Sequence, residues 1–209
     1  MGSREASKEC SHVSPDEVRE RYERIRAEVG DAVTIVAATK YVSVEELAVL
    51  AEAGIEVVGE NRAQDLEAKH EVYGDAFRWH FIGHLQSRKA KTVNAICELV
   101  HSLSSESAAK RLEIPALVEV NLSAEETKSG VSEGELDTLI AAYPDVRGLM
   151  TMPPETEDPE RSRPYFRRLR ELAADRGLKE LSMGTSQDYP IAVEEGATLI
   201  RIGSVLYHG

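Results

Sequence analysis

The chain has 209 residues, a net charge of −12 and a hydrophobic content of 42%. This composition supports a sizeable core. A strongly acidic chain is a poor partner for nucleic acid or an anionic membrane surface, because both bind clustered Lys and Arg. No apolar run approaches the roughly 20 residues that a membrane-spanning helix needs. We therefore expect a protein that binds neither nucleic acid nor a membrane.

The first segment, MGSREASKECSHVS, is polar and lacks the apolar stretch of a signal peptide. Only two cysteines are present, Cys10 and Cys97, so we expect no disulfide framework and predict a reducing cytoplasm as the location. No group of His, Cys and Asp residues has the spacing of metal ligands. We predict a disordered tail over residues 1–13 and one domain over residues 14–209.

A first helix is predicted over residues 15–28, because Ser14 and Pro15 are typical of a helix start. After it, short apolar runs rich in Val, Ile and Leu alternate with charged segments of helical period. Such continuous apolar runs are typical of strands that are buried on both faces. The predicted strands are residues 33–38, 55–58, 79–82, 99–103, 116–122, 146–150, 180–183 and 198–202.

Eight strands alternating with helices predict a single (β/α)8 barrel of the TIM type, because a βα repeat keeps its strands parallel. An open, doubly wound sheet is the alternative. The chain ends at Gly209, a few residues after the eighth strand. We therefore expect no helix after that strand, and we expect the N-terminal helix to complete the outer ring.

Functional residues of such a barrel gather at the carboxyl ends of its strands. Lys40 stands directly after the first predicted strand. An amine that is desolvated in an apolar mouth can form a Schiff base with an aldehyde, although a solvated lysine in a loop fits the same position.

The last two strands are followed by residues that suit a phosphate group. Gly203 and Ser204 come directly after the eighth strand, and Ser186 precedes a predicted helix. Free backbone N–H groups and hydroxyls at such turns bind phosphate, although ordinary turn and capping chemistry explains either segment alone. Arg201 lies inside the eighth strand. It is either paired in a buried salt bridge or placed against a ring nitrogen or oxygen of a ligand.

Two other features have simpler interpretations. His80 and His101 lie within predicted strands, and we interpret them as core residues whose hydrogen bonds are satisfied. The segment RSRPYFRRLR is basic on one face of a predicted helix. We interpret it as a solvated face, with an anionic partner as the alternative.

Six motifs stand in a fixed order along the chain: VAATK, VGENRAQ, WHFIGHLQSRK, VEVNLSAEETKSGV, GLMTM and LSMGTSQDYPIAVEEGATLIRIGSVLY. In order, spacing and residue identity these motifs resemble those of the pyridoxal phosphate homeostasis proteins, which are single-domain relatives of the alanine racemase barrel. The resemblance covers residues 33–207. It implies a protein that binds pyridoxal 5′-phosphate (PLP) and buffers or delivers it inside the cell without substantial catalysis.

The resemblance also assigns residues to the cofactor site. It implies that Lys40 forms a Schiff base with PLP and that Arg201 lies close to the pyridine and phosphate side of the cofactor. The further positions that it implies are Asn61 near the cofactor, Ser186, Gly203 and Ser204 at its phosphate, and Met183 and His84 near the pocket.

This chain departs from the family pattern at three places. Thr185 stands where the family usually has a methionine, and His208 interrupts the last motif. The segment before the fifth strand looks shortened, so we expect a short helix there. None of these departures involves Lys40.

Three functions remain open at this point. The first is a monomeric PLP carrier that serves PLP-dependent apoenzymes. The second is an amino-acid racemase, but enzymes of this kind take a tyrosine base from a second domain, and we expect no room for one after the eighth strand. The third is an aldolase that uses Lys40 on a phosphorylated sugar. Binding of other B6 vitamers is not determined by the sequence.

Overall fold

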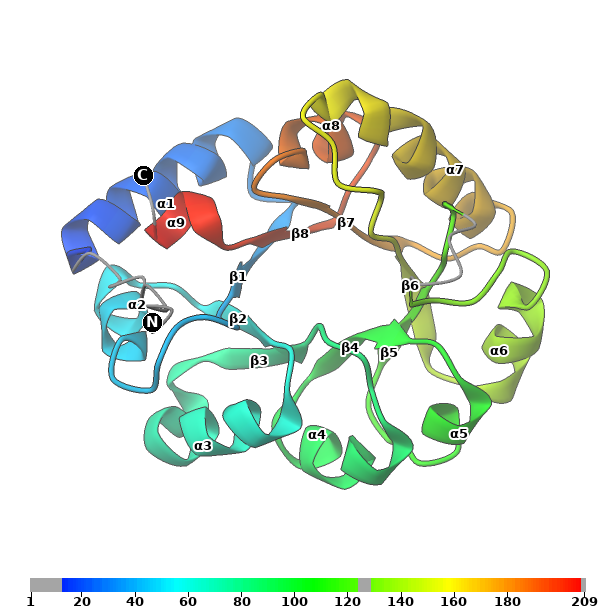
Figure 1. Ribbon diagram of the computed structural model, residues 1–209, viewed down its shortest axis with the longest axis horizontal. Helices are drawn as coiled ribbons and strands as arrows, with labels where there is room; N and C mark the ends of the chain where they lie inside the picture. Colours follow the sequence, from blue (N-terminus) through cyan, green and yellow to red (C-terminus); the bar gives the residue numbers. More distant parts are fainter. Residues whose placement is uncertain (1–12, 124–128, 208–209) are drawn as a thin grey trace, which may run out of the picture.

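The computed structural model describes residues 13–123 and 129–207, in which eight parallel strands form a closed barrel surrounded by helices (Figure 1). The strands are β1 Thr34–Ala38, β2 Val57–Glu60, β3 Arg78–Phe81, β4 Leu99–Leu103, β5 Ala116–Glu119, β6 Val146–Met150, β7 Glu180–Thr185 and β8 Leu199–Ile202. The predicted tail over residues 1–13 lies outside the described residues except for Val13, which packs against the core.

The strands pair in chain order, and β8 pairs with β1 in parallel to close the sheet. The (β/α)8 barrel predicted from the alternating pattern is therefore confirmed, and the alternative of an open sheet is wrong. The fifth predicted strand is longer than β5. Directly after β5, Val120 still donates a hydrogen bond to the Met150 carbonyl at 2.8 Å and also forms an isolated bridge with Val131.

Helices cover the outside of the barrel. The α-helices are α1 Pro15–Val29, α2 Leu47–Ala53, α3 Ala63–Tyr73, α4 Ala90–Ile96, α5 Glu106–Ala109, α6 Leu136–Ala142, α7 Arg163–Ala174, α8 Tyr189–Glu194 and α9 Ser204–Tyr207. The described residues also contain the short 3-10 helices η1 Gly74–Ala76, η2 Ser87–Lys89 and η3 Pro159–Ser162. The short helix expected before the fifth strand is α5, which has only four residues.

The N-terminal helix completes the outer ring, as predicted. Ser14 caps α1 through reciprocal hydrogen bonds with Glu17, which satisfy free backbone N–H groups. The helix lies between α2 and α8 (Figure 1). The expectation that no helix follows the eighth strand is wrong, because α9 packs against α1, and Arg21 donates a hydrogen bond to the Leu206 carbonyl at 3.0 Å.

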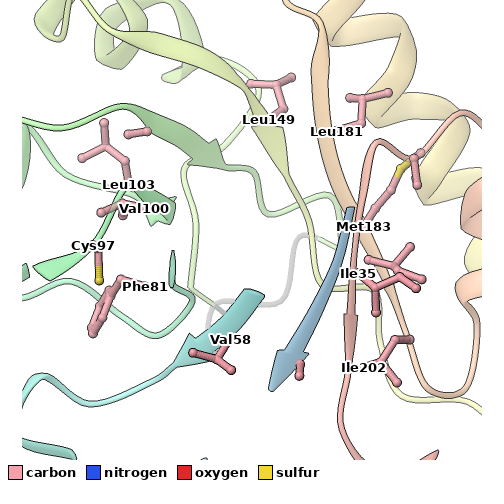
Figure 2. Close-up of a cluster of buried hydrophobic side chains, with 14 of the residues drawn as sticks. Ile35, Val58, Phe81, Cys97, Val100, Leu103, Leu149, Leu181, Met183 and Ile202 are labelled. Carbon is pink, nitrogen blue, oxygen red and sulfur yellow. The ribbon is translucent and has the colours of Figure 1, made fainter. Parts of the chain in front are cut away.

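Two hydrophobic clusters lie on the two faces of the barrel wall. The larger one fills the layer between strands and helices, and Figure 2 shows part of it around Ile35, Met183 and Ile202. The smaller one comprises Val36, Val57, Leu99, Leu117, Met150 and Leu199. Successive residues of a strand point to opposite faces, so these six side chains occupy the barrel interior.

The basic face of α7 carries carboxylate partners. Arg163 pairs with Glu160, Glu194 and Glu195, and Arg168 pairs with Glu133. These ion pairs support the interpretation of a solvated face.

None of the helices in the described part of the chain has the length and apolar character of a membrane span.

Candidate functional site

A cavity of about 1170 Å³ opens at the carboxyl ends of the strands, where the barrel fold predicts function. Its walls include residues of the loops after β1, β2, β3, β5, β6, β7 and β8. The predicted site residues that line it are Lys40, Asn61, His84, Ser186, Arg201, Gly203 and Ser204. Seven of the eight predicted positions therefore meet in one cavity, although they are up to 164 residues apart in the chain.

Met183 is the predicted site residue that the structure does not bring to the cavity. Its side chain is fully buried and packs in the hydrophobic layer between strands and helices (Figure 2). The reason is strand alternation: Ser182 points into the barrel, so its neighbour Met183 must point outward. The expectation of a Met183 side chain at the pocket is therefore corrected.

Lys40 lies at the mouth of the cavity and is exposed. Its ammonium nitrogen lies 4.6 Å from the centre of the Tyr41 ring, in a cation–π arrangement. The Lys40 amine is not desolvated by apolar walls as expected, because Lys40 is exposed and the neighbouring Tyr41 is itself 81% exposed. Lys40 is thus accessible both to a ligand in the cavity and to molecules outside it.

The backbone that carries Lys40 is held by a buried ion pair. Lys69 contacts Glu60 at 2.5 Å and donates to the carbonyl of Thr39, the residue before Lys40, at 2.8 Å. Thr39 in turn donates its hydroxyl to Glu60 at 2.6 Å. Glu60 also accepts from the backbone N–H of Asn61 at 3.0 Å. One carboxylate at the end of β2 thereby fixes both Lys40 and Asn61 relative to the cavity.

Three oxygen atoms of cavity-lining residues are buried and have no hydrogen-bond partner among the described residues. They are Asn61 Oδ1, Ser162 Oγ and the Tyr207 hydroxyl oxygen. Burial raises the pKa of the Tyr207 hydroxyl, so it stays protonated and can donate. An unpaired buried polar atom costs free energy, which makes these three atoms candidates to bind a ligand.

The turns after β7 and β8 are joined through Ser186. Its hydroxyl oxygen accepts from the backbone N–H groups of Gly203 at 3.1 Å and of Val205 at 3.4 Å. Hydroxyl and N–H groups therefore converge at one side of the cavity, as a phosphate site requires. Ser204 is exposed beside them.

Thr185 shapes the turn that carries Ser186. Its backbone N–H and its hydroxyl both donate to Asp188 Oδ1, at 2.7 and 3.0 Å. A methionine at this position could not form the side-chain bond. The departure at Thr185 therefore adds an anchor to the Ser186 turn.

Arg201 is buried in the barrel wall and forms no ion pair within the described part of the chain. Its guanidinium donates to Ser182 Oγ at 2.5 Å, to the Thr151 carbonyl at 3.1 Å and to Met152 Sδ at 2.8 Å. Burial lowers its pKa to about 10, which still leaves it charged at neutral pH. Within the described residues, these hydrogen bonds take the place of the buried salt bridge that was the alternative.

Glu119 is a site residue that the sequence reasoning missed. It stands at the end of β5, is 7% exposed and lines the same cavity as Arg201. Burial raises its pKa to about 7, and the charge of Arg201 opposes this rise. A carboxylate inside the apolar run ALVEV was the available signal, because an acidic residue at a buried strand position is as unusual as Arg201.

The family comparison agrees with this geometry. The model of the alanine racemase N-terminal domain matches residues 13–209. A pyridoxal phosphate homeostasis protein of Aquifex aeolicus is 40% identical over 194 residues, covering 83% of this chain and 85% of the relative. One from Pseudomonas aeruginosa is 37% identical and covers 74% of this chain and 75% of the relative. The chain belongs to the pyridoxal phosphate homeostasis protein family.

Solved structures show the same relationship. PipY of Synechococcus elongatus, whose structure was solved with PLP bound, superimposes with a TM-score of 0.81 at 30% identity. The match covers 91% of this chain and 99% of PipY. Alanine racemase of Corynebacterium glutamicum has a TM-score of 0.72 at 17% identity, and this likeness shows the barrel fold alone.

Proposed function

We propose that this homeostasis protein family member binds PLP in the cavity at the carboxyl ends of its strands and buffers or delivers it. One observation carries the proposal: Lys40 shares a single cavity with the Ser186–Gly203 turn and with the Arg201 guanidinium, which pairs with no carboxylate among the described residues. The names of the relatives and the PLP-bound structure of PipY support it. An aldolase lacks such support.

The residues present fit the cofactor. Lys40 is an accessible amine, and PLP supplies an aldehyde with which such an amine forms a Schiff base. The Ser186 hydroxyl, whose oxygen accepts from the Gly203 N–H, would donate its proton to the phosphate, and Gly203 would leave room for that group. Asn61 Oδ1 and the Tyr207 hydroxyl, both unpartnered in the described structure, would gain partners on the ligand. His84 and Ser204 are exposed at the cavity and would lie at its rim.

We assign the protein a carrier role rather than amino-acid turnover. Arg201, placed at the ring side of the ligand, keeps its positive charge and discourages protonation of a ring nitrogen beside it, which weakens the electron sink that amino-acid chemistry needs. The exposure of Lys40 favours a carrier, because a recipient apoenzyme or a free amine can reach the bound group. We further propose a monomer that works in the cytoplasm.

The binding test uses purified protein, PLP and borohydride, which fixes the cofactor to its lysine. We expect yellow protein, a label on Lys40 by peptide mapping, and no label in Lys40→Ala. Lys91→Ala is the matched control, because Lys91 is an exposed lysine outside the cavity. A label on another lysine, or full covalent binding in Lys40→Ala, would refute the assignment of Lys40.

The carrier role has its own test. PLP-loaded protein is incubated with L-amino acids in D2O, and α-proton exchange and chirality are followed. We expect negligible turnover. Racemisation at about 1 s⁻¹ or faster that is lost in Lys40→Ala would establish an enzyme instead.

A further inference from the structure

A chain of hydrogen-bonded polar side chains crosses the interior of the barrel and ends at Arg201. Arg201 contacts Ser182 Oγ, and Ser182 Oγ lies 2.8 Å from His101 Nδ1. His101 Nε2 lies 2.9 Å from His80 Nδ1, and His80 Nε2 lies 2.9 Å from Glu98 Oε1. The four residues Ser182, His101, His80 and Glu98 are hereafter the interior chain.

The interior chain runs from one face of the barrel to the other. Glu98 directly precedes β4, at the amino-terminal end of the strands, and its side chain is 41% exposed. His80 and His101 lie in the middle of β3 and β4 and are 3% and 0% exposed. Arg201 lines the cavity at the opposite, carboxyl-terminal end. The chain thus connects surface and cavity through the barrel.

Donor and acceptor roles along the chain follow from its ends. A guanidinium only donates, so Ser182 Oγ accepts from Arg201 and directs its own proton to His101 Nδ1. His101 therefore carries its proton on Nε2 and donates it to His80 Nδ1. His80 then carries its proton on Nε2 and donates it to Glu98.

The charges agree with this direction. Burial lowers the pKa of His101 well below its usual value, which keeps the ring neutral. The hydrogen bond from His80 lowers the pKa of Glu98 to about 2, so the terminal acceptor is a carboxylate. Every bond then runs from the Arg201 cation towards the Glu98 anion.

Packing alone does not require these polar groups. Other interior positions of the barrel are filled by Val, Leu and Met, which fill space without needing hydrogen bonds. Two imidazoles and a hydroxyl at such positions are stable only if every bond is made. Their effect is directional, because they hold the Ser182 oxygen where it receives Arg201.

We propose that His80 and His101 are positioning residues of the PLP site: together with Glu98 they orient Ser182, which sets the Arg201 guanidinium towards the ring side of the cofactor. This inference rests on the proposed PLP binding. Within the described structure three of the five guanidinium N–H groups are used, by Ser182, Thr151 and Met152. The interior chain thereby fixes the plane of the Arg201 guanidinium, and with it the directions of the remaining N–H donors.

The first measurement needs no cofactor. In ligand-free protein, ¹⁵N NMR of the imidazoles is expected to show a proton on Nε2 of each ring, where His101 donates to His80 and His80 donates to Glu98. In Ser182→Ala, His101 Nδ1 loses its donor, and we expect its nitrogen shift to move while the His80 signal moves less. An Nδ1–H tautomer at either ring in the wild-type protein would overturn the chain direction.

The second measurement is the affinity and absorbance of bound PLP. We expect Ser182→Ala and His101→Leu to weaken PLP binding about tenfold, the loss of one hydrogen bond to a charged group, and to shift the absorbance maximum. His101→Gln, which keeps a donor and an acceptor, should rescue much of the loss. Thr198→Ala is the control, because it removes a hydroxyl bond between the same two strands away from the cavity.

The two proposals fail differently. If wild-type protein binds no PLP, the proposed function fails, and the NMR experiment still tests the interior chain. If the wild-type protein binds PLP and Ser182→Ala, His101→Leu and Thr198→Ala all bind it with the same affinity and spectrum, the positioning role is wrong. If His101→Gln is as weak as His101→Leu, the ring is needed for its shape rather than for its hydrogen bonds, which also overturns the proposal.

Discussion

Individual residues at the cavity differ in whether the fold itself needs them. The Glu60–Lys69 pair is buried and holds the backbone before Lys40, so its loss would disturb the fold and the site together. Gly203 and Glu119 are different, because their surroundings separate a role in ligand binding from a role in packing. Substitutions of Gly203 and Glu119 therefore test the ligand site separately from the packing of the fold.

Gly203 tests the phosphate site. A Cβ at this position would meet nothing closer than Ala38 at 3.7 Å, which is an ordinary contact, so Gly203→Ala should fold normally. A larger side chain, in Gly203→Val, should enter the space of the phosphate and weaken PLP binding at least tenfold, since each charge-assisted bond contributes about 1.5–3 kcal/mol. The measurement is a titration with PLP and with pyridoxal.

Pyridoxal, which has no phosphate, should bind wild-type protein far more weakly than PLP and should be little affected by Gly203→Val. Ser186→Ala is expected to weaken PLP binding in the same way as Gly203→Val, because it removes the hydroxyl that joins the two turns. Equal affinities of wild-type protein for the two vitamers would rule out a phosphate site here.

Glu119 makes the stability of the ligand-free protein depend on pH. Burial raises its pKa from 4.5 to about 7, so the folded protein binds more protons than the unfolded chain between these pH values. The stabilisation by neutral Glu119 is present below pH 4.5 and is lost as the pH rises through about 7. Its size is about 3 kcal/mol.

Glu119→Gln should abolish this dependence. Urea unfolding at pH 5 and pH 8 is expected to show that the variant loses less stability than wild-type protein on going to the higher pH. The difference between the two proteins isolates Glu119, because other titrating groups cancel. Parallel stability curves for the two proteins would contradict the raised pKa.

At the scale of elements, the site depends on how closely the end of β7 approaches α8. Gly184 has φ of +92°, and a Cβ there would lie 2.6 Å from the Ala192 Cβ. This close packing brings the Ser186 turn to the end of β8. The segment GTS, residues 184–186, thus contributes to the site in two ways. Gly184 has no side chain and allows the close packing, and Thr185 and Ser186 supply hydroxyls.

Gly184→Ala should therefore cost about 2–4 kcal/mol of unfolding free energy, from a strained backbone and a clash together. PLP affinity should fall as well, because α8 and Ser186 must shift. Gly177→Ala is the control: its φ is +67° and a Cβ there meets nothing within 4 Å, so it carries backbone strain alone. Equal losses in the two variants would show that the contact with α8 is unimportant.

For the whole molecule, ring closure links the N-terminal helix to the ligand cavity. α1 packs on α2 and α8 and also holds α9, whose Tyr207 lines the cavity. Ile25 is the largest fully buried side chain of α1. Damage to α1 should therefore reach the site although Ile25 contacts no ligand.

Ile25→Ala is expected to cost about 2–5 kcal/mol, by loss of buried surface and by the cavity that it leaves. The melting temperature should fall by roughly 4–20 °C, measured by circular dichroism. Glu23→Ala, on the exposed face of the same helix, should change stability by less than about 0.5 kcal/mol. A small effect of Ile25→Ala would mean that the ring holds without tight packing of α1.

The sequence by itself determined the barrel, because βα alternation and continuous apolar runs reflect local periodicity that a single chain displays. It also indicated Lys40, Ser186 and Gly203, since motifs at strand ends mark the mouth of a barrel before any contact is known. Arg201 stood out as a cation in an apolar run, but its partners could not be inferred.

The tertiary structure decided which residues face the cavity and which residues contact each other across the barrel. Met183 was misplaced because a strand's facing direction depends on its register in the closed sheet, and α9 was missed because four residues form a helix only when α1 covers them. The interior chain connects residues 80, 98, 101 and 182 to Arg201, and no local pattern links these strands. Hydrogen-bond direction and burial arise only when the barrel closes and brings distant strands within bonding distance.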